Sequence, residues 1–226
     1  METQCDNGML LLIDKPKHIS SFGFIWELRK KYRVKKVGHA GTLDPLASGL
    51  LIVAIGPATK QLRQYVGLDK VYEAEVCVGE KSATGDAEGP IIEAVHVPMI
   101  PKTKIQAVLC SMHGVLRLPV SPYSATKQGG EPLYKKVRRG ESPIVPIRDM
   151  EVLDARLTKP PQRTGDCIHL FVRFRVSSGT YVRSLAEELG KRLGYPARLE
   201  NLRRTAIGTH AVENALPLSI RSLKEK

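Results

Sequence analysis

The sequence has few of the residues that build metal centres and disulfide frameworks. Its four cysteines, Cys5, Cys77, Cys110 and Cys167, are widely spaced and form no C-x-x-C pair. This spacing suggests neither a zinc site nor a set of disulfides, and free thiols fit a reducing cytoplasm. Glycine-rich phosphate loops are absent as well. The sequence thus contains no motif that would indicate a metal site or a phosphate-loop nucleotide site.

Long apolar runs are also missing. None approaches the ~20 residues with which a helix spans a bilayer. The chain starts with the acidic segment METQCD, whereas a secretory signal needs a basic segment followed by an apolar core. The sequence therefore predicts no membrane span and no export, and we expect the protein in the cytoplasm.

Acidic residues are scarce relative to basic ones. The chain has 23 Asp and Glu against 35 Lys and Arg, which gives a formal charge of +12 and a pI near 9.6. Such a balance favours polyanionic partners, with nucleic acid first and an anionic membrane surface second. With 226 residues, 42% of them hydrophobic, the chain can bury a core as one large domain or two small lobes. A largely disordered chain is excluded.

Hydrophobic periodicity indicates both strands and helices, so the predicted fold class is α+β. Residues 9–13 and the apolar run 49–56 are typical of strands. Residues 72–78 and 168–176 alternate as half-buried strands do. A helix is expected over 22–32, capped by Ser20 or Ser21. A second helix is expected over 182–193, with an apolar stripe formed by Val182, Leu185, Ala186, Leu189 and Leu193.

The segment Gly38–Ser48 places one carboxylate, Asp44, in a loop shaped by two glycines and a proline. Gly38 and Gly41 permit positive φ or the close approach of a ligand, and Pro45 moves Asp44 away from the α region. Asp44 has two interpretations. It is either a turn former whose side chain bonds nearby amides, or a functional acid mounted against the buried strand that follows.

Three other features each have two interpretations. Arg183 follows the turn Gly179-Thr180 and could pair bidentately with a carboxylate on another element, or be an ordinary first-turn helix residue. Tyr72 could stack on a base, or be a core or rim residue of its strand. Residues 119–147 combine prolines with a basic cluster. They form either a mobile insertion that grips phosphates or a solvated loop with a cationic helix face.

Several segments together resemble the TruB family of tRNA pseudouridine synthases. The segment GHAGTLDPLASG at 38–49 resembles the family's catalytic motif nearly residue for residue. Other segments are similar to family motifs in the expected order, and the resemblance covers roughly residues 9–217. These segments are LIDKP at 12–16 with Ser20-Ser21, KVYEA at 70–74, SGTYVRSL at 178–185 and LRRTAIG at 202–208.

The resemblance implies a fold and a set of site residues. The fold would be a long, mostly antiparallel, curved sheet with surrounding helices and a central active-site cleft. Asp44 would be the catalytic nucleophile, Arg183 its cationic partner, and Tyr72 the residue that stacks on the base and helps the C5 proton leave. Substrate-binding positions would be His39, Tyr181, Leu202 and Lys15, the last as a support of the Asp44 loop rather than a direct contact.

The implied reaction is the isomerisation of uridine 55 in the T-arm of tRNA. The enzyme breaks the C1′–N1 bond, rotates the uracil and rejoins it through C5, which requires no metal or cofactor. An ionised carboxylate, a cation beside it and a dry pocket for the extruded base are needed. Whether Asp44 attacks C1′, assists glycal formation or adds to C6 stays open. The 119–147 insertion, with its SPYSA and GEPLY elements, resembles the loop that grips the RNA.

The chain also departs from the family pattern. His18 stands where the family usually has glycine, so the turn after Pro16 is expected to differ. We expect tails at 1–8 and 219–226, a catalytic domain at 9–218, and no C-terminal PUA-type domain. A stand-alone monomer without membrane or metal is expected. The alternative is an RNA-binding, tRNA-folding chaperone with the same fold, in which catalysis is secondary.

Overall fold

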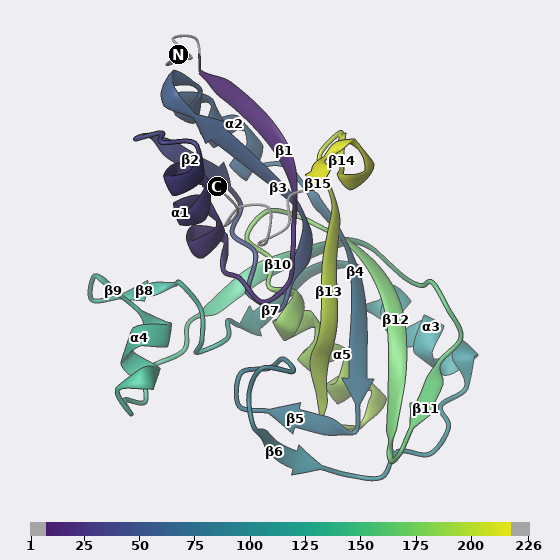
Figure 1. Cartoon of the computed structure of the whole chain (residues 1–226). Coiled ribbons are helices and arrows are strands. Elements are labelled where there is room, and N and C mark those ends of the chain that lie inside the picture. The colour runs from purple at the N-terminus through teal and green to yellow at the C-terminus, as the bar shows by residue number, and fades with distance from the viewer. Residues whose placement is uncertain (1–7, 218–226) are drawn as a thin grey trace. The chain divides into compact units, whose positions relative to one another are not determined.

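The computed structural model describes residues 8–217 (Figure 1). The predicted tails at 1–8 and 219–226 lie outside this range, except for Gly8. The chain forms two compact units, of which the first comprises residues 1–73 and 202–226 and the second residues 74–201. Strands β4 (Lys70–Val78) and β13 (Ala197–Ile207) each continue from one unit into the other. In the described part of the chain, no helix is long and apolar enough to cross a membrane.

The first unit is built around β3 (Ser48–Ile55), and the order of its strands in the sheet is β15-β1-β3-β13. Antiparallel β1 (Met9–Lys15) and β2 (Val37–Ala40) both pair with β3, and β13 pairs with it in parallel. The remaining elements are α1 (Ser21–Lys31), the 3-10 turn η1 (Gly56–Gln61), α2 (Leu62–Val66), β14 (His210–Ala211), the 3-10 turn η2 (Val212–Asn214) and β15 (Leu216–Pro217).

From Gly49 onward β3 has no polar side chain, because both of its faces are buried over most of its length. Leu51 and Val53 pack with Ile13 and with Phe24 of α1. The alternate residues Leu50 and Ile52 point to the other face and form a second cluster with Ala40, Ile207 and Val212. A strand covered on both faces shows a continuous apolar run instead of alternation, which is what the sequence has at 49–56.

The second unit is mostly antiparallel, with the strand order β4-β12-β10-β7. Strand β10 (Ile147–Leu157) pairs antiparallel with both β12 (Cys167–Val176) and β7 (Gly114–Pro119). The other elements are β5 (Glu80–Ser82), β6 (Ile91–Ala94), α3 (Lys102–Ser111), β8 (Lys127–Gln128), β9 (Glu131–Pro132), α4 (Leu133–Arg138), β11 (Gln162–Thr164) and α5 (Val182–Leu193).

The α+β prediction is confirmed, and so are the helices and strands that the sequence analysis expects. Helix α5 has the predicted bounds, and its predicted apolar stripe is buried. Helix α1 is capped by Ser20, whose side chain accepts a hydrogen bond from the Gly23 amide at 3.0 Å. The strands expected at 9–13, 72–78 and 168–176 are β1, β4 and β12.

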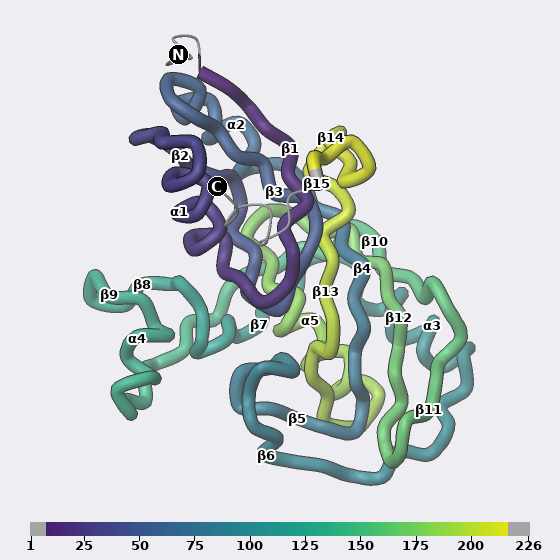
Figure 2. Tube along the Cα trace, viewed as in Figure 1, coloured from purple at the N-terminus to yellow at the C-terminus, as the bar shows by residue number. Residues whose placement is uncertain are grey.

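The 119–147 insertion contains a short hairpin, β8 and β9, followed by α4. Figure 2 shows it as a projection of the chain between β7 and β10. Arg139 ends this helix and donates hydrogen bonds of 2.6 and 2.7 Å to the two carboxylate oxygens of Glu131. It also donates to Glu141 at 2.8 Å. The cationic face is thus partly neutralised by carboxylates of the same segment.

Gly49 is the glycine of the first unit at which another part of the backbone comes closest, and this gives a prediction about the free energy of unfolding. Gly49 has φ +104°, and a Cβ there would lie 2.2 Å from the Arg204 carbonyl oxygen across the β3–β13 pair. Gly114 has φ +97° with nothing near its Cβ position. Gly49→Ala should cost about 3–5 kcal/mol, since it adds steric overlap to left-handed strain, whereas Gly114→Ala should cost about 1–2 kcal/mol. Urea unfolding of both variants tests this, and equal losses would contradict it.

Candidate active site

The loop that carries Asp44 is fixed on its N-terminal side by helix α1. The buried hydroxyl of Ser21 donates to the Leu43 carbonyl at 3.0 Å and accepts from the Leu43 amide at 2.8 Å. Both backbone polar groups of the residue before Asp44 are therefore satisfied by one side chain. Asp44 itself is half-buried. A backbone held at this point limits the positions available to the carboxylate.

The same loop is fixed on its C-terminal side by the turn that precedes α1. The His18 amide donates to the Pro45 carbonyl at 2.7 Å. His18 has φ +64°, a left-handed conformation that glycine adopts without strain. The turn therefore keeps a glycine-like backbone although the residue is histidine. Lys15 is fully buried and donates from Nζ to the carbonyls of Pro16 and Ile19 at 2.8 and 2.7 Å, so it braces this turn.

A fully buried arginine that the sequence analysis did not single out makes a further contact with the loop. Arg204 donates to the Gly41 carbonyl from Nη2 and to the Leu50 carbonyl from Nε, both at 2.8 Å. Its guanidinium also lies 6.0 Å from the ring centroid of Tyr72. The carbonyl contacts tie the loop to β3, and the ring contact holds Tyr72 beside them.

The other predicted site residues of the first unit come from its strands. Tyr72 on β4 and Leu202 on β13 are buried, and His39 on β2 is half-buried with Nε2 3.4 Å from Thr42 Oγ1. Burial, and then the charge of Arg204, lower the pKa of His39 below its usual value. The neutral form of the imidazole is therefore favoured more than in a solvent-exposed histidine.

Arg183 lies at the start of α5, among polar groups of the second unit. Its Nη1 donates to the Thr84 carbonyl at 3.0 Å and to Ser121 Oγ at 2.9 Å, and lies 3.6 Å from Asp86 Oδ2. Its Nη2 lies 3.5 Å from the Tyr123 carbonyl. Both Arg183 and Asp86 are buried. The guanidinium is therefore held in one orientation by two loops that are distant in sequence.

Asp86 is itself held in place by its own loop. Its Oδ1 accepts from Thr84 Oγ1 at 2.6 Å and from the Glu88 amide at 3.1 Å. Ser82 Oγ donates to the Asp86 carbonyl at 2.5 Å. The sequence analysis missed this support of Arg183. The available signal was a cluster of small polar residues and glycine directly before an acid.

Tyr181 precedes α5 and contacts the insertion. Its hydroxyl lies 3.1 Å from Thr126 Oγ1. Since Ser121 and Tyr123 contact Arg183, the segment expected to grip RNA begins beside the arginine. The predicted site residues thus form two groups. Asp44, His39, Tyr72, Lys15 and Leu202 belong to the first unit, and Arg183 and Tyr181 to the second.

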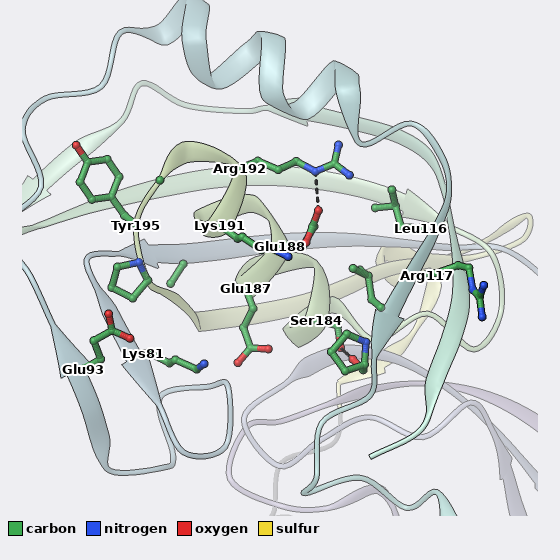
Figure 3. A pocket seen from close by; sticks show the side chains of 15 residues that line it. Lys81, Glu93, Leu116, Arg117, Ser184, Glu187, Glu188, Lys191, Arg192 and Tyr195 are labelled. Atoms are coloured by element: carbon green, nitrogen blue, oxygen red, sulfur yellow. Dashed lines mark hydrogen bonds and ion pairs between the residues drawn. The ribbon is translucent and has the colours of Figure 1, made fainter. Parts of the chain in front are cut away.

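A cavity of about 710 Å³ lies against α5 in the second unit (Figure 3). None of the predicted site residues lines it. Its wall carries cations and carboxylates together, and Arg192 donates to Glu188 at 2.7 Å. Burial raises the pKa of Glu187 in the same wall. The mixed charge favours no single class of ligand. The charged residues are Lys81, Arg117, Lys191 and Arg192 with Glu93, Glu187 and Glu188.

Superposition on solved structures identifies the class to which the fold belongs. The structure superimposes on an archaeal box H/ACA sRNP Nop10–Cbf5 complex with TM-score 0.65 and 23% identity, covering 94% of this chain and 51% of that chain. A Cbf5–Nop10–Gar1 complex gives TM-score 0.69 and 24% identity, covering 94% of this chain and 53% of that one. The chain thus spans about half the length of these solved chains, and its fold is that of the pseudouridine synthases.

Sequence relatives define the family. The model of the TruB family pseudouridylate synthase, N-terminal domain, matches residues 29–182. A tRNA pseudouridine synthase B from Desulfotalea psychrophila is 39% identical over 217 residues, covering 96% of this chain and 88% of that protein. The protein of that name from Xanthomonas campestris is 42% identical over 195 residues, with coverages of 86% and 62%. The chain belongs to the TruB family of pseudouridylate synthases.

Lys70 shows how Arg204 affects its neighbours. This buried lysine donates from Nζ to the carbonyls of Val66 and Leu68 at 2.7 and 2.6 Å. Burial, and then the nearby charge of Arg204, lower its pKa from 10.5 to about 8, against an opposing effect of Asp69. Between these two values the unfolded chain binds a proton that the folded chain does not. The contribution of Lys70 to the free energy of unfolding therefore increases as the pH rises through this window.

We expect the Lys70 side chain to titrate near pH 8 in the folded protein. The measurement is an NMR pH titration of the lysine Cε resonances, in which Lys70 is assigned by the signal missing from Lys70→Arg. A midpoint above pH 10 for that signal would contradict the burial argument. Arg204→Met should raise the midpoint, because it removes a neighbouring positive charge.

Proposed function

We propose that this protein is a tRNA pseudouridine synthase that isomerises uridine 55 in the T-arm, with Asp44 as the nucleophile. Membership of the TruB family and relatives named tRNA pseudouridine synthase B support the reaction class. The observation that carries the role of Asp44 is the anchoring of its loop. Leu43 and Pro45, on either side of the aspartate, are both held by hydrogen bonds from residues 18–21.

In this proposal Arg183 is the cation that keeps the Asp44 carboxylate ionised during attack. A guanidinium can serve two oxygens of a carboxylate in a fixed plane, which a lysine cannot. The contacts of Arg183 with Thr84 and Ser121 support the role, because they orient the guanidinium before substrate binds. That the aspartate and the arginine act on the same nucleotide is part of the proposal.

The flipped uracil is assigned to Tyr72, Tyr181 and Leu202, with His39 contacting the RNA that it leaves. Buried Tyr72 and Leu202 would exclude water from the broken glycosidic bond. Tyr72 is also assigned the later role of helping the C5 proton leave. Extrusion of the base costs a few kcal/mol of stacking, which single-stranded loops reduce. A structured stem-loop such as the T-arm is therefore the proposed substrate.

Phosphate binding is assigned to the basic surface of the 119–147 insertion. Because Arg139 is engaged by Glu131 and Glu141, the contacts fall to Lys135, Lys136 and Arg138. The net charge of +12 supports an RNA partner. We propose that the enzyme works as a monomer in the cytoplasm. The isomerisation moves one bond within the nucleotide, so it consumes no cofactor.

The first test compares the protein with Asp44→Asn on T-arm RNA carrying 5-tritiated uridine. Tritium leaves C5 only if the base has been rejoined there, and loss of the nucleophile should slow release by at least about 1,000-fold. The matched control is Asp149→Asn, which changes an exposed aspartate paired with Arg117 and should leave release unchanged. Equal rates of release by the wild type and Asp44→Asn would overturn the assignment of Asp44.

The chaperone alternative is separated by the same pair of proteins. If neither the wild type nor Asp44→Asn releases tritium but both bind and refold tRNA, the chaperone function is favoured. If the wild type alone releases tritium, the synthase and its nucleophile are established.

A second test concerns the planar geometry of Arg183. Arg183→Lys keeps the charge but not the contacts of Nη1 and Nη2, so tritium release should fall about 100-fold. Arg192→Lys changes the same residue type on the same helix, at an ion pair with Glu188. It should retain full activity. Equal rates in the two variants would show that charge alone is needed at position 183.

A further inference from the structure

Two cysteines that are far apart in the sequence come together in the second unit. Cys77 lies on β4 and Cys167 on β12, strands that are neighbours in the sheet order. Their sulfurs and a carboxylate oxygen of Glu80 all lie within 4.8 Å of one another. Cys77 Sγ is 3.9 Å from Glu80 Oε2. Both thiols are buried, whereas the side chain of Glu80 is 28% exposed. The cluster is thus open to solvent on its carboxylate side.

The spacing suits three ligands of one metal ion. At a tetrahedral angle, an ion that binds sulfur at about 2.3 Å and oxygen at about 2.1 Å holds the two atoms about 3.6 Å apart. Cys77 Sγ and Glu80 Oε2 are 3.9 Å apart, slightly more than this distance. Two thiolates with one carboxylate leave a fourth tetrahedral position for water. Sulfur ligands favour soft cations over magnesium or calcium.

Arg198 lies where a supporting residue of such a site is expected. It donates to Glu80 Oε2 from Nε at 3.0 Å and from Nη2 at 2.8 Å, and it also pairs with Glu200. Metal-binding carboxylates are commonly oriented by such outer hydrogen bonds. Two thiolates and the Glu80 carboxylate carry three negative charges. A divalent ion offsets two of these charges and a monovalent ion only one, which favours a divalent ion. Arg198 is shared between Glu80 and Glu200.

Gly79 provides the space for this arrangement. It has φ +122°, and a Cβ there would lie 3.1 Å from Cys167 Sγ. Its amide donates to the Pro196 carbonyl and its carbonyl accepts from the Val95 amide, both at 2.8 Å. The backbone between Cys77 and Glu80 is therefore fixed, and its missing side chain leaves room for the sulfur.

We propose that Cys77, Cys167 and Glu80 form a binding site for a thiophilic divalent cation of the zinc type. On binding, each thiol S–H bond breaks, the proton passes to water and the sulfur bonds to the ion. Burial raises the pKa of both thiols, so the ion has to displace both protons. The bound ion would join β4, β5 and β12 and stabilise the second unit. This proposal does not depend on the proposed function.

Cadmium is the probe, because thiolate–cadmium bonds absorb in the ultraviolet. The protein background carries Cys5→Ser and Cys110→Ser, so that Cys77 and Cys167 are its only thiols, and a phosphine reductant prevents disulfides. We expect one Cd²⁺ per chain, a thiolate–cadmium band and displacement by Zn²⁺. Unfolding temperature should rise with either ion. Absence of the band, or binding without it, would overturn the proposal.

Variants identify the ligands. Cys167→Ser in that background should lose the band. Because a buried substitution can impair folding, Glu80→Gln and Arg198→Ala provide partly exposed alternatives, and each should weaken Cd²⁺ binding about 10–100-fold. Glu93→Gln, on the paired strand β6, is the matched control and should bind as the background does. Unchanged affinity in both Glu80→Gln and Arg198→Ala would overturn the site.

Discussion

The hydrogen bonds donated by the buried guanidinium of Arg204 connect the aspartate loop to the rest of the first unit. Placing a cation in the interior costs several kcal/mol unless its donors are satisfied. Here the donors meet the carbonyls of Gly41 and Leu50, one in the loop and one in the strand that follows it. Removal of the arginine would leave both carbonyls and the face of Tyr72 without this partner. Arg204 is therefore a support that the loop, the strand and the tyrosine have in common, beside the bonds of Ser21 and His18 to the loop.

The same charge influences the ionisation of its surroundings. It contributes to the lowered pKa values of His39 and Lys70, although burial is the larger cause in both cases. Neighbouring basic groups are thereby shifted toward their neutral forms. The surroundings of the Asp44 loop thus contain the buried cation Arg204 beside two basic side chains, His39 and Lys70, whose pKa values are lowered.

Local pattern was sufficient to predict β1, α1, β3, β4, β12 and α5. It did not predict other regular elements, among them α3 and the long strand β10. The bounds of α5 follow from its apolar stripe and from Gly194, which ends the helix with φ +94°. The cap of α1 could be predicted because a serine hydroxyl before a helix can accept a hydrogen bond from an amide of the first turn. The hairpin of β8 and β9 was not predicted, because its strands have two residues each and too few positions to show alternation.

The supports of the site could not be read from local pattern either. Ser21 and Leu43 are 22 residues apart, and Arg204 and Gly41 are 163 apart. The cysteine spacing gave no indication of a metal site for the same reason, since Cys77 and Cys167 meet only when two strands pair. The resemblance to the family motifs suggested the proposed roles of Asp44 and Arg183, and the structure shows which residues contact the Asp44 loop and Arg183.

The two central residues are fixed in different ways, and this difference determines how substitutions can be interpreted. Arg183 is held through its own side chain, so any replacement removes both the functional group and its anchoring contacts. The loop of Asp44 is held through the backbones of Leu43 and Pro45. These backbone bonds do not involve the carboxylate. Asp44→Asn should therefore leave these backbone hydrogen bonds in place while it removes the negative charge.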